Sequence, residues 1–185
     1  IRDHARRKSS CYGNCMAGML VRLGKKLGFN VSRFENVDYE KLILDNFWNE
    51  DYFFEDVRRR PVIVGDANVF PFWTGVVKDK ESKKKAFNTM RDEGLDKPYP
   101  LKYTVEKQKL GFWDLFVHGY EINTVWMHIG LAYVSECEDI FPVLHDEYVS
   151  KLCSLVDMHK TFLELYDKNG NVFKKLFYVT DEGML

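Results

Sequence analysis

Apolar residues recur at helical spacing near the start of the chain. Between residues 11 and 27 they fall three or four positions apart, and Gly28 follows where a helix C-terminus is expected. Asp38 stands in N-cap position before a second periodic run, residues 39–47. The periodic residues of the first run are Met16, Met19, Leu20, Leu23 and Leu27. This pattern predicts two amphipathic helices.

Two later segments are apolar on almost every side. Residues 67–77 follow Asp66, which we expect to be their N-cap. Residues 125–134 follow Asn123 or Thr124, either of which can take the same role. A helix without a polar face is usually buried all round. We therefore predict two inner helices.

Each inner helix is followed by a one-sided helix. Residues 78–91 are mostly charged, and residues 143–159 keep their apolar positions on one side. The narrow apolar stripe of the first of these consists of Ala86, Phe87 and Met90. An alternation of inner and outer helices describes a toroid better than a simple bundle. We predict an all-α fold, a partial (α/α) toroid of inner and outer helix pairs.

Long aromatic-rich loops separate these helices. Residues 95–120 contain Pro98, Pro100 and Gly111 but no helical periodicity, and a loop of that length usually has a function. Phe, Tyr and Trp together make up 15% of the chain. Either the core is unusually aromatic, or some of the rings face a ligand.

The composition is that of an ordinary globular protein. By length alone, the 185 residues fit a single domain, and the 27 basic and 28 acidic residues leave a net charge of -1. This balance supplies no strong field for nucleic acid or an acidic membrane surface. No apolar run approaches the roughly 20 residues that span a bilayer. We therefore expect no nucleic-acid partner and no membrane partner.

The two ends of the chain predict a fragment. The first residue is Ile1 rather than Met, and residues 179–185 resemble the cap and first turn of a helix that is then cut. We interpret residues 1–185 as a single helical domain that is a fragment of a larger protein.

The cysteines and histidines predict neither a metal nor a cofactor. Cys11 and Cys15 share one helix face, but a zinc site needs a closer pair and further ligands to complete its tetrahedron. The five histidines are scattered. Four cysteines without a dense framework, Cys137 and Cys153 included, indicate thiols in a reducing compartment. We therefore expect a cytoplasmic protein.

Five short motifs occur in an order that is similar to that of one protein family. They are NFWNE (46–50), GDANVFPFW (65–73), PYPLKY (98–103), TVWMH (124–128) and TFLELYD (161–167). The series resembles the C-terminal half of the six-hairpin (α/α)6-toroid glycosidases, the group of trehalase, processing α-glucosidase and amylo-α-1,6-glucosidase. The resemblance runs from about Tyr12 to the end and implies a glycoside hydrolase of carbohydrate metabolism, acting on gluco- or manno-oligosaccharides.

Two carboxyl groups catalyse hydrolysis in that family. One protonates the departing glycosidic oxygen, and the other activates water on the opposite face of the sugar. The family base falls in the TFLELYD segment, so the resemblance assigns that role to Glu164. The family acid lies in hairpins that this chain does not contain, and Asp66 is the only well-placed local substitute. Two plainer roles stay open: Asp66 as a helix cap alone, and Glu164 as a carboxylate that points to solvent.

Six further residues are candidates for binding the sugar substrate. They are Asn68, Trp73, Tyr99, Lys102, Trp126 and His128. Asn68 can bond either a sugar hydroxyl or a neighbouring loop. Trp73 and Trp126 can stack on a sugar face or belong to the core.

The remaining three binding candidates also have plainer alternatives. His128 follows an indole on an inner helix, where a histidine is commonly a core residue with its hydrogen bonds satisfied. Tyr99 and Lys102 can close one side of a pocket, but the prolines beside them can equally serve only to stiffen the loop.

Two functions follow from these observations. The first is a glycoside hydrolase with a two-carboxylate mechanism and an oligosaccharide substrate. The second is a catalytically inactive helical binding module derived from that fold, either as a homodimer or in association with the missing N-terminal half. A sugar isomerase or epimerase on a related toroid would need paired histidines, and His128 has no obvious partner in the sequence.

Overall fold

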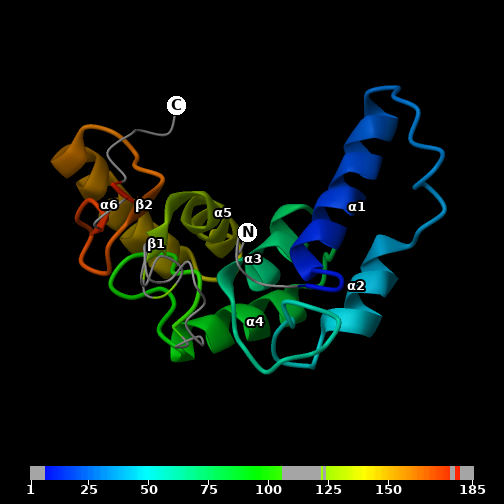
Figure 1. The fold of residues 1–185 in the computed structure, drawn as a ribbon, viewed down its shortest axis with the longest axis horizontal. Coiled ribbons are helices and arrows are strands. Elements are labelled where there is room, and N and C mark those ends of the chain that lie inside the picture. Colours follow the sequence, from blue (N-terminus) through cyan, green and yellow to red (C-terminus); the bar gives the residue numbers. More distant parts are fainter. Residues whose placement is uncertain (1–6, 106–121, 123, 176–177, 180–185) are drawn as a thin grey trace. The chain divides into compact units, whose positions relative to one another are not determined.

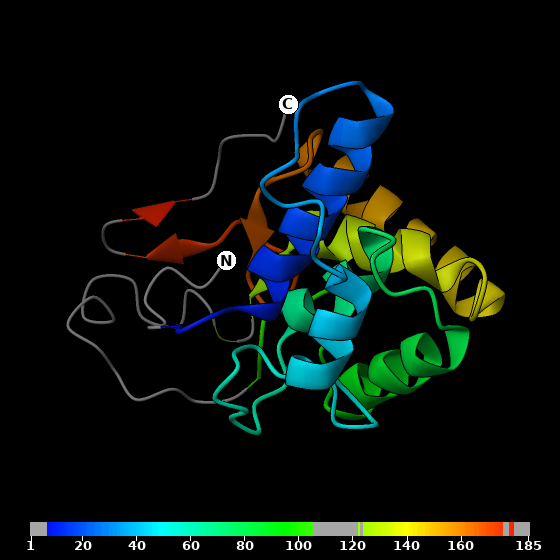
Figure 2. The same cartoon turned by 90° about the vertical axis from the view of Figure 1, so that its right-hand side faces the viewer.

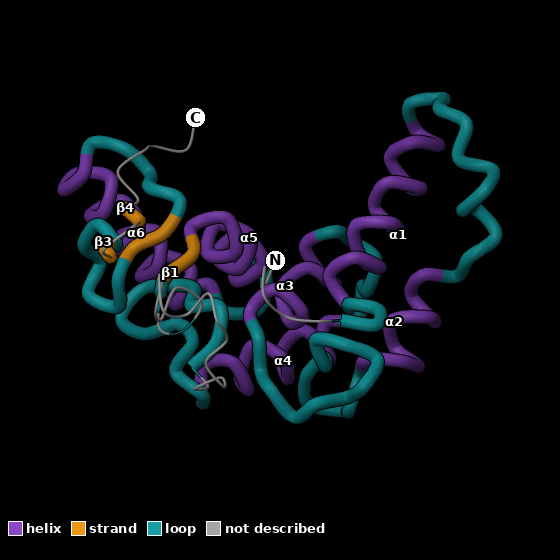
Figure 3. The backbone as a smooth tube through the Cα atoms, in the orientation of Figure 1, coloured by secondary structure: helices purple, strands orange, loops and turns teal. Residues whose placement is uncertain are grey.

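The computed structural model describes residues 7–105, 122, 124–175 and 178–179 (Figure 1). The chain divides into two compact units, and their described residues run to Thr89 in unit one and from Met90 onward in unit two. The described residues form six helices and four two-residue strands (Figure 3). The protein is thus mostly helical, as the sequence predicts.

Unit one is built from helices and the loops between them. Its elements are α1 (Cys11–Lys26), α2 (Tyr39–Phe47), α3 (Gly65–Trp73) and the larger part of α4 (Lys80–Asp92). Helix α1 packs against both α2 and α3 (Figure 2). The core of unit one includes the buried sides of these three helices.

The ends of the first two helices follow the predicted capping chemistry. The Asp38 side chain accepts a hydrogen bond from the Lys41 N–H at 3.0 Å, which caps α2. Helix α1 ends at Lys26, and Gly28 then takes φ +77°, a left-handed conformation that favours glycine. Both predicted helices are confirmed.

The face that α1 buries is not the one its large apolar residues mark out. The residues of its buried face are Cys11, Cys15, Gly18, Val21 and Gly24. A Cβ on Gly18 would lie 2.8 Å from Val76 Cγ2 and 3.0 Å from Tyr39 Cβ, so this face is in close contact with its neighbours. Small residues allow that approach, and the leucines of α1 are left at the surface.

Helix α3 is the buried inner helix that the sequence predicts, but its start and its end differ from the prediction. Residues 65–72 are all buried. The helix begins at Gly65 with Val64 in N-cap position, so the prediction of Asp66 as N-cap is wrong. Asp66 is instead the second helical residue. The helix also ends at Trp73 rather than at residue 77, because Gly75 takes a left-handed φ of +66° just after the Thr74 C-cap.

Helix α4 is one-sided, as the sequence predicts. Ala86, Phe87 and Met90 are fully buried, while most of its lysines are exposed. The Phe87 ring meets the Phe72 ring of α3 edge to face, with 5.9 Å between centroids. The narrow apolar stripe is therefore confirmed.

Unit two pairs two helices and adds short antiparallel strands. Its elements are β1 (Val125–Trp126), α5 (Met127–Cys137), α6 (Pro142–His159), β2 (Leu165–Tyr166), β3 (Lys174–Lys175) and β4 (Tyr178–Val179). Helix α5 packs on α6, strand β1 pairs with β2, and β3 pairs with β4. In the first sheet Val125 lies opposite Tyr166 and Trp126 opposite Leu165.

One sequence expectation changes in unit two, and another is met. The second inner helix begins at Met127 rather than at residue 125, because Val125 and Trp126 pair as a strand instead. Residues 95–105 contain no helix, and their β pairings are the isolated bridges of Lys102 with Val125 and of Thr104 with Ile122, which is compatible with the expected loop. The rest of that predicted loop, the proposed cap Asn123 and the proposed cut helix after residue 179 lie outside the described residues.

No helix among the described residues has both the length and the apolar character needed to cross a bilayer.

Candidate functional site

Three of the five motifs meet in unit two at the start of α5. The Trp126 N–H donates to the Leu101 carbonyl at 2.9 Å, and the Met127 N–H donates to the Glu164 carbonyl at 3.1 Å. Lys102 also forms an antiparallel bridge with Val125. The PYPLKY, TVWMH and TFLELYD segments are therefore held side by side by their backbones. We call the candidate residues that they carry the α5-entry cluster: Tyr99, Lys102, Trp126, His128 and Glu164.

Two glycines allow these segments to approach so closely. A Cβ on Gly130 of α5 would lie 2.6 Å from the Pro100 carbonyl oxygen and 2.9 Å from the Leu101 nitrogen. A Cβ on Gly170 would lie 2.7 Å from the Tyr99 ring, and its φ of +85° also favours glycine. At both positions a residue larger than glycine would clash with the turn that carries Tyr99.

Glu164 is the exposed residue of an otherwise buried segment. Leu163 is 3% exposed, and Leu165 and Tyr166 are fully buried. Glu164 lies between them at the surface. Glu164 lies at a bend in the backbone, and its buried neighbours on both sides anchor the segment. The Glu164 side chain is exposed, which is compatible both with the plainer role and with a carboxylate that water can reach.

Trp126 and His128 form a ring pair at the entry to α5. Their ring centroids lie 5.7 Å apart with planes at 90°. Trp126 is 4% exposed, and its indole Nε1 donates to Thr124 Oγ1 at 2.9 Å. The indole is therefore a core residue in this structure, and His128 is half-buried beside it.

Lys102 is held by its own loop. Its Nζ donates to the Gly94 carbonyl at 3.1 Å. Burial lowers the pKa of Lys102, the nearby Asp96 charge opposes that shift, and Lys168 adds to it. Tyr99 in the same loop is half-buried.

In unit one, Asn68 of the GDANVFPFW motif binds the loop that follows the NFWNE motif. This side chain is fully buried, and its Oδ1 accepts a hydrogen bond from the Phe53 N–H at 2.7 Å. Its Nδ2 donates to the carbonyls of Phe53 at 3.2 Å and Val64 at 2.9 Å. Of the two roles considered for Asn68, the structure therefore shows the second, bonding to a neighbouring loop.

The other two candidates of unit one differ in exposure. Asp66 is 1% exposed, and burial followed by the Asp66 charge raises the pKa of Tyr12. Trp73, the last residue of α3, is 43% exposed and meets Phe70 edge to face at 5.5 Å. The two proposed catalytic carboxyl groups thus belong to different units, Asp66 to the first and Glu164 to the second.

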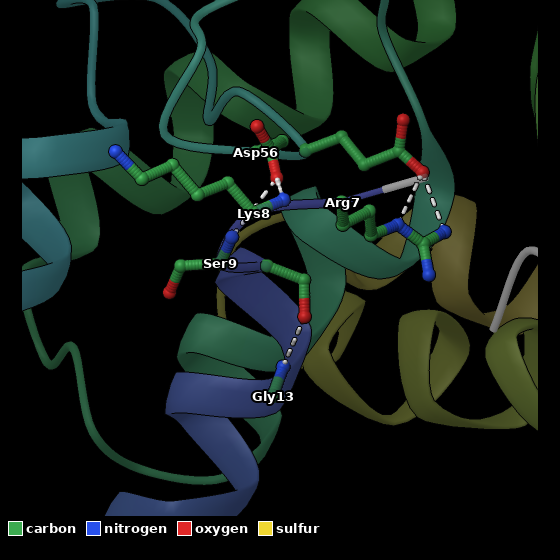
Figure 4. A network of polar contacts seen from close by, with 7 residues as sticks. Arg7, Lys8, Ser9, Gly13 and Asp56 are labelled. Atoms are coloured by element: carbon green, nitrogen blue, oxygen red, sulfur yellow. Dashed lines mark hydrogen bonds and ion pairs between the residues drawn. The ribbon is translucent and has the colours of Figure 1, made fainter. Parts of the chain in front are cut away.

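A carboxylate that the sequence did not single out anchors the start of the chain to unit one. Asp56 Oδ2 accepts hydrogen bonds from the backbone N–H groups of Lys8 at 2.6 Å and Ser9 at 3.1 Å (Figure 4). Its Oδ1 accepts from the Arg58 N–H at 3.0 Å. Beside it, Arg7 donates from Nε and Nη2 to one oxygen of Glu55, at 2.9 and 2.5 Å. These contacts hold residues 7–9 in place, and no local sequence pattern predicts them.

A second unforeseen carboxylate lies in the core of unit two. Asp96 is 3% exposed and accepts a hydrogen bond from the Tyr148 hydroxyl of α6. Arg91 Nε lies 3.7 Å from the same oxygen. Burial is the main cause that raises the pKa of Tyr148, and the hydrogen bond to Asp96 adds to it. This buried pair joins α6 to the loop that leads into the α5-entry cluster.

Within the part of the chain that the structure describes, no group of three or more His, Cys, Asp or Glu residues could hold a metal ion. An apolar hollow of about 260 Å³ lies elsewhere in unit two, between α5 and α6. Leu131, Val149, Cys153 and Phe162 are among its lining residues.

Comparison with known protein families and with curated proteins finds no match to this chain.

Proposed function

We propose that this chain is part of a carbohydrate-active glycoside hydrolase that acts on gluco- or manno-oligosaccharides. The observation that supports it is the meeting of three motif segments at the start of α5, with Glu164 exposed among buried neighbours. A general base must be reachable by water and by the sugar, and must also sit on a firmly held backbone. Glu164 meets both requirements.

In the proposed reaction Glu164 is the general base. Its carboxylate takes a proton from a water molecule as that water attacks the anomeric carbon, while a second carboxyl group protonates the departing oxygen. Asp66 is 1% exposed, so a glycosidic oxygen has no access to its carboxyl group in this conformation. The proposal therefore rests on Glu164, and the burial of Asp66 favours a structural role for that residue.

The proposed sugar contacts come from the accessible members of the candidate set. His128 and Tyr99 are half-buried and carry groups that bond hydroxyls. In unit one, Trp73 is 43% exposed, and its indole can stack on a sugar ring independently of the α5-entry cluster. Trp126 and Asn68 support these elements from within, because both are buried and hydrogen-bonded.

The proposal also includes the toroid architecture and a cytoplasmic location. The alternation of buried α3 with one-sided α4, and of mostly buried α5 with half-exposed α6, is the pattern of inner and outer helices. All four cysteines, each of them among the described residues, are thiols, which favours a reducing compartment.

The test is hydrolysis of α-linked gluco- and manno-disaccharides, with the present chain and with any longer natural protein that contains it. Glu164→Gln removes the base while keeping the shape of the side chain. We expect this variant to lose about 100-fold or more in kcat/KM. Glu138→Gln is the matched control, because Glu138 is exposed at the other end of α5. Equal activity of the Glu164 variant and the wild type would contradict the proposal.

The second candidate is an inactive binding module with the same sugar contacts. The burial of Asp66 favours it, since a hydrolase with a single accessible carboxyl group lacks its acid. A wild-type chain that binds oligosaccharides without hydrolysing them, with affinity unchanged in Glu164→Gln and lowered in His128→Ala, would support this candidate. Titration followed by NMR chemical shifts measures both affinities.

A further inference from the structure

Helix α1 and the segment after it expose six large apolar side chains. We call them the α1 apolar face: Leu20, Leu23, Leu27, Phe29, Phe34 and Val37. Leu27 and Phe29 are each 68% exposed and Leu20 is 60% exposed. Within unit one, the C-terminal half of α1 and residues 28–37 extend away from α3 (Figures 1 and 2).

This face is carried by ordered backbone. The Phe29 N–H donates to the Gly24 carbonyl at 2.9 Å, and Lys25 pairs with Glu35 at 3.3 Å. Val31 packs so closely on Gly24 that a Cβ there would lie 2.6 Å from its Cγ1. The segment is thus folded back onto α1, and these contacts hold its backbone beside the exposed leucines of that helix.

The leucines of this face are not buried against other residues of unit one that the structure describes. Helix α1 already buries its opposite side through Cys11, Cys15 and Gly18. A surface helix of a monomer normally has one apolar face, whereas α1 has two. The six side chains expose apolar area on the order of 600 Å², at the upper limit for monomers and close to the roughly 800 Å² that one partner contributes to a stable interface.

We propose that the α1 apolar face is the interface of a homodimer, covered by the same face of a second copy. Leu20, Leu23 and Leu27 follow the three-to-four spacing with which two helices interdigitate. Lys25 and Lys26 lie together at the C-terminal end of α1, so a parallel pair would bring like charges together. The two helices therefore pair antiparallel about a two-fold axis, an arrangement that an isologous contact allows.

The test is the mass of the protein in solution, measured by sedimentation equilibrium from about 1 to about 200 µM. We expect the wild type to approach twice its chain mass of 21.9 kDa. Leu20→Glu and Leu23→Lys should each raise the dissociation constant at least tenfold. Both positions are exposed, so these variants keep the fold, which circular dichroism verifies. Val143→Glu in α6, where Val143 is 84% exposed, is the control and should dimerise like the wild type.

Three outcomes would overturn the proposal. One is a wild type that stays monomeric at the highest concentration. Another is a dimer that neither variant weakens, or that Val143→Glu weakens equally. The third is a monomer that binds anionic lipid vesicles through the same leucines, which would assign the face to a membrane surface. The dimer proposal does not depend on the glycosidase proposal, because it uses none of the same residues.

Discussion

Asn68 pairs with the backbone of Phe53 as a neighbouring strand would. Its amide oxygen accepts from the Phe53 N–H at 2.7 Å, and its amide nitrogen donates back to the Phe53 carbonyl at 3.2 Å. The same nitrogen donates to the Val64 carbonyl at 2.9 Å. One buried side chain therefore fixes the loop after α2 against the start of α3, and so sets the position of Asp66.

Replacement of this amide should destabilise the protein. Asn68→Ala leaves three buried backbone groups without the partner that Asn68 supplies, and we expect the free energy of unfolding to fall by about 2–4 kcal/mol. Asn46→Ala is the control, because Asn46 is exposed and its loss should cost less than about 0.5 kcal/mol. Urea unfolding measures both values. Equal losses in the two variants would show that the Asn68 amide has no special role.

The Asp56 anchor should make stability depend on acid pH. Burial alone would raise the pKa of Asp56, but hydrogen bonds from the Arg58, Ser9 and Lys8 N–H groups outweigh it, so the pKa lies below its ordinary 3.8. A lowered pKa in the folded state adds stability that is present above 3.8 and is lost as the pH falls through the folded value.

Asp56→Asn tests this dependence. The neutral amide accepts the same hydrogen bonds more weakly, so we expect a loss of about 2 kcal/mol near pH 7. The difference from the wild type should shrink at about pH 3, because the unfolded wild-type carboxylate, with its ordinary pKa of 3.8, is by then mostly protonated. Urea unfolding at both pH values gives the comparison, with Asp51→Asn at an exposed position as the control. A difference that is constant with pH would argue against the anchor.

The hydrogen bond from Tyr148 to Asp96 should stabilise unit two. Tyr148→Phe removes a donor from a carboxylate that is 3% exposed, and we expect a loss of about 1–3 kcal/mol in unfolding free energy. Tyr39→Phe, at a half-buried position of α2, should change stability by less than about 0.5 kcal/mol. If the two substitutions have the same small effect, the buried pair contributes no net stability.

The raised pKa of Tyr148 can be checked by its absorbance. Burial and the hydrogen bond to Asp96 favour the neutral phenol, so the folded protein keeps Tyr148 neutral at about pH 11. The unfolded chain ionises this phenol at its ordinary pKa of 10.0, so the free energy of unfolding falls as the pH rises above that value. Folded wild type and Tyr148→Phe should therefore show the same phenolate absorbance at that pH. One phenolate fewer in the variant would mean that Tyr148 ionises normally.

Gly130 should be required for the turn that carries Tyr99. In Gly130→Ala the new Cβ would lie 2.6 Å from the Pro100 carbonyl oxygen, so the turn must move away from α5. We expect a loss of about 2 kcal/mol, even though alanine favours a helix more than glycine does. Ser135→Ala, at an exposed position of the same helix, is the control. Thermal unfolding measures both, and a stabilised Gly130→Ala would disprove the close contact.

Where an element depends on neighbouring residues, the sequence predicted it well. Asp38 caps α2 through a residue three positions away, and the stripe of Ala86, Phe87 and Met90 is visible within two turns of α4. Residues 142–159 form one helix with Pro142 at its first position, where the missing N–H costs nothing. Propensity, capping and periodicity act over four or five residues, so they can be seen in the sequence alone.

Features that depend on distant residues were decided by the tertiary structure. Val125 and Trp126 form a strand instead of the first turn of the predicted helix. The Leu101 carbonyl accepts a hydrogen bond from the Trp126 N–H, and strand β2 (Leu165–Tyr166) pairs with both residues. The site candidates follow the same rule, since only the pairing of remote segments makes Trp126 a core residue and leaves Glu164 at the surface.

The sequence by itself determined a mostly helical protein with two buried helices, and which residues are able to carry chemistry. Only the tertiary structure decided which face of α1 is buried. The face that carries its leucines is the more apolar one, but it is exposed. The opposite face is buried because Gly18 lets the helix approach Val76 and Tyr39 closely, and these residues are far from Gly18 in the sequence. Close packing depends on complementary shape as well as on apolar area. Whether two distant segments have complementary shapes cannot be predicted from a local sequence pattern.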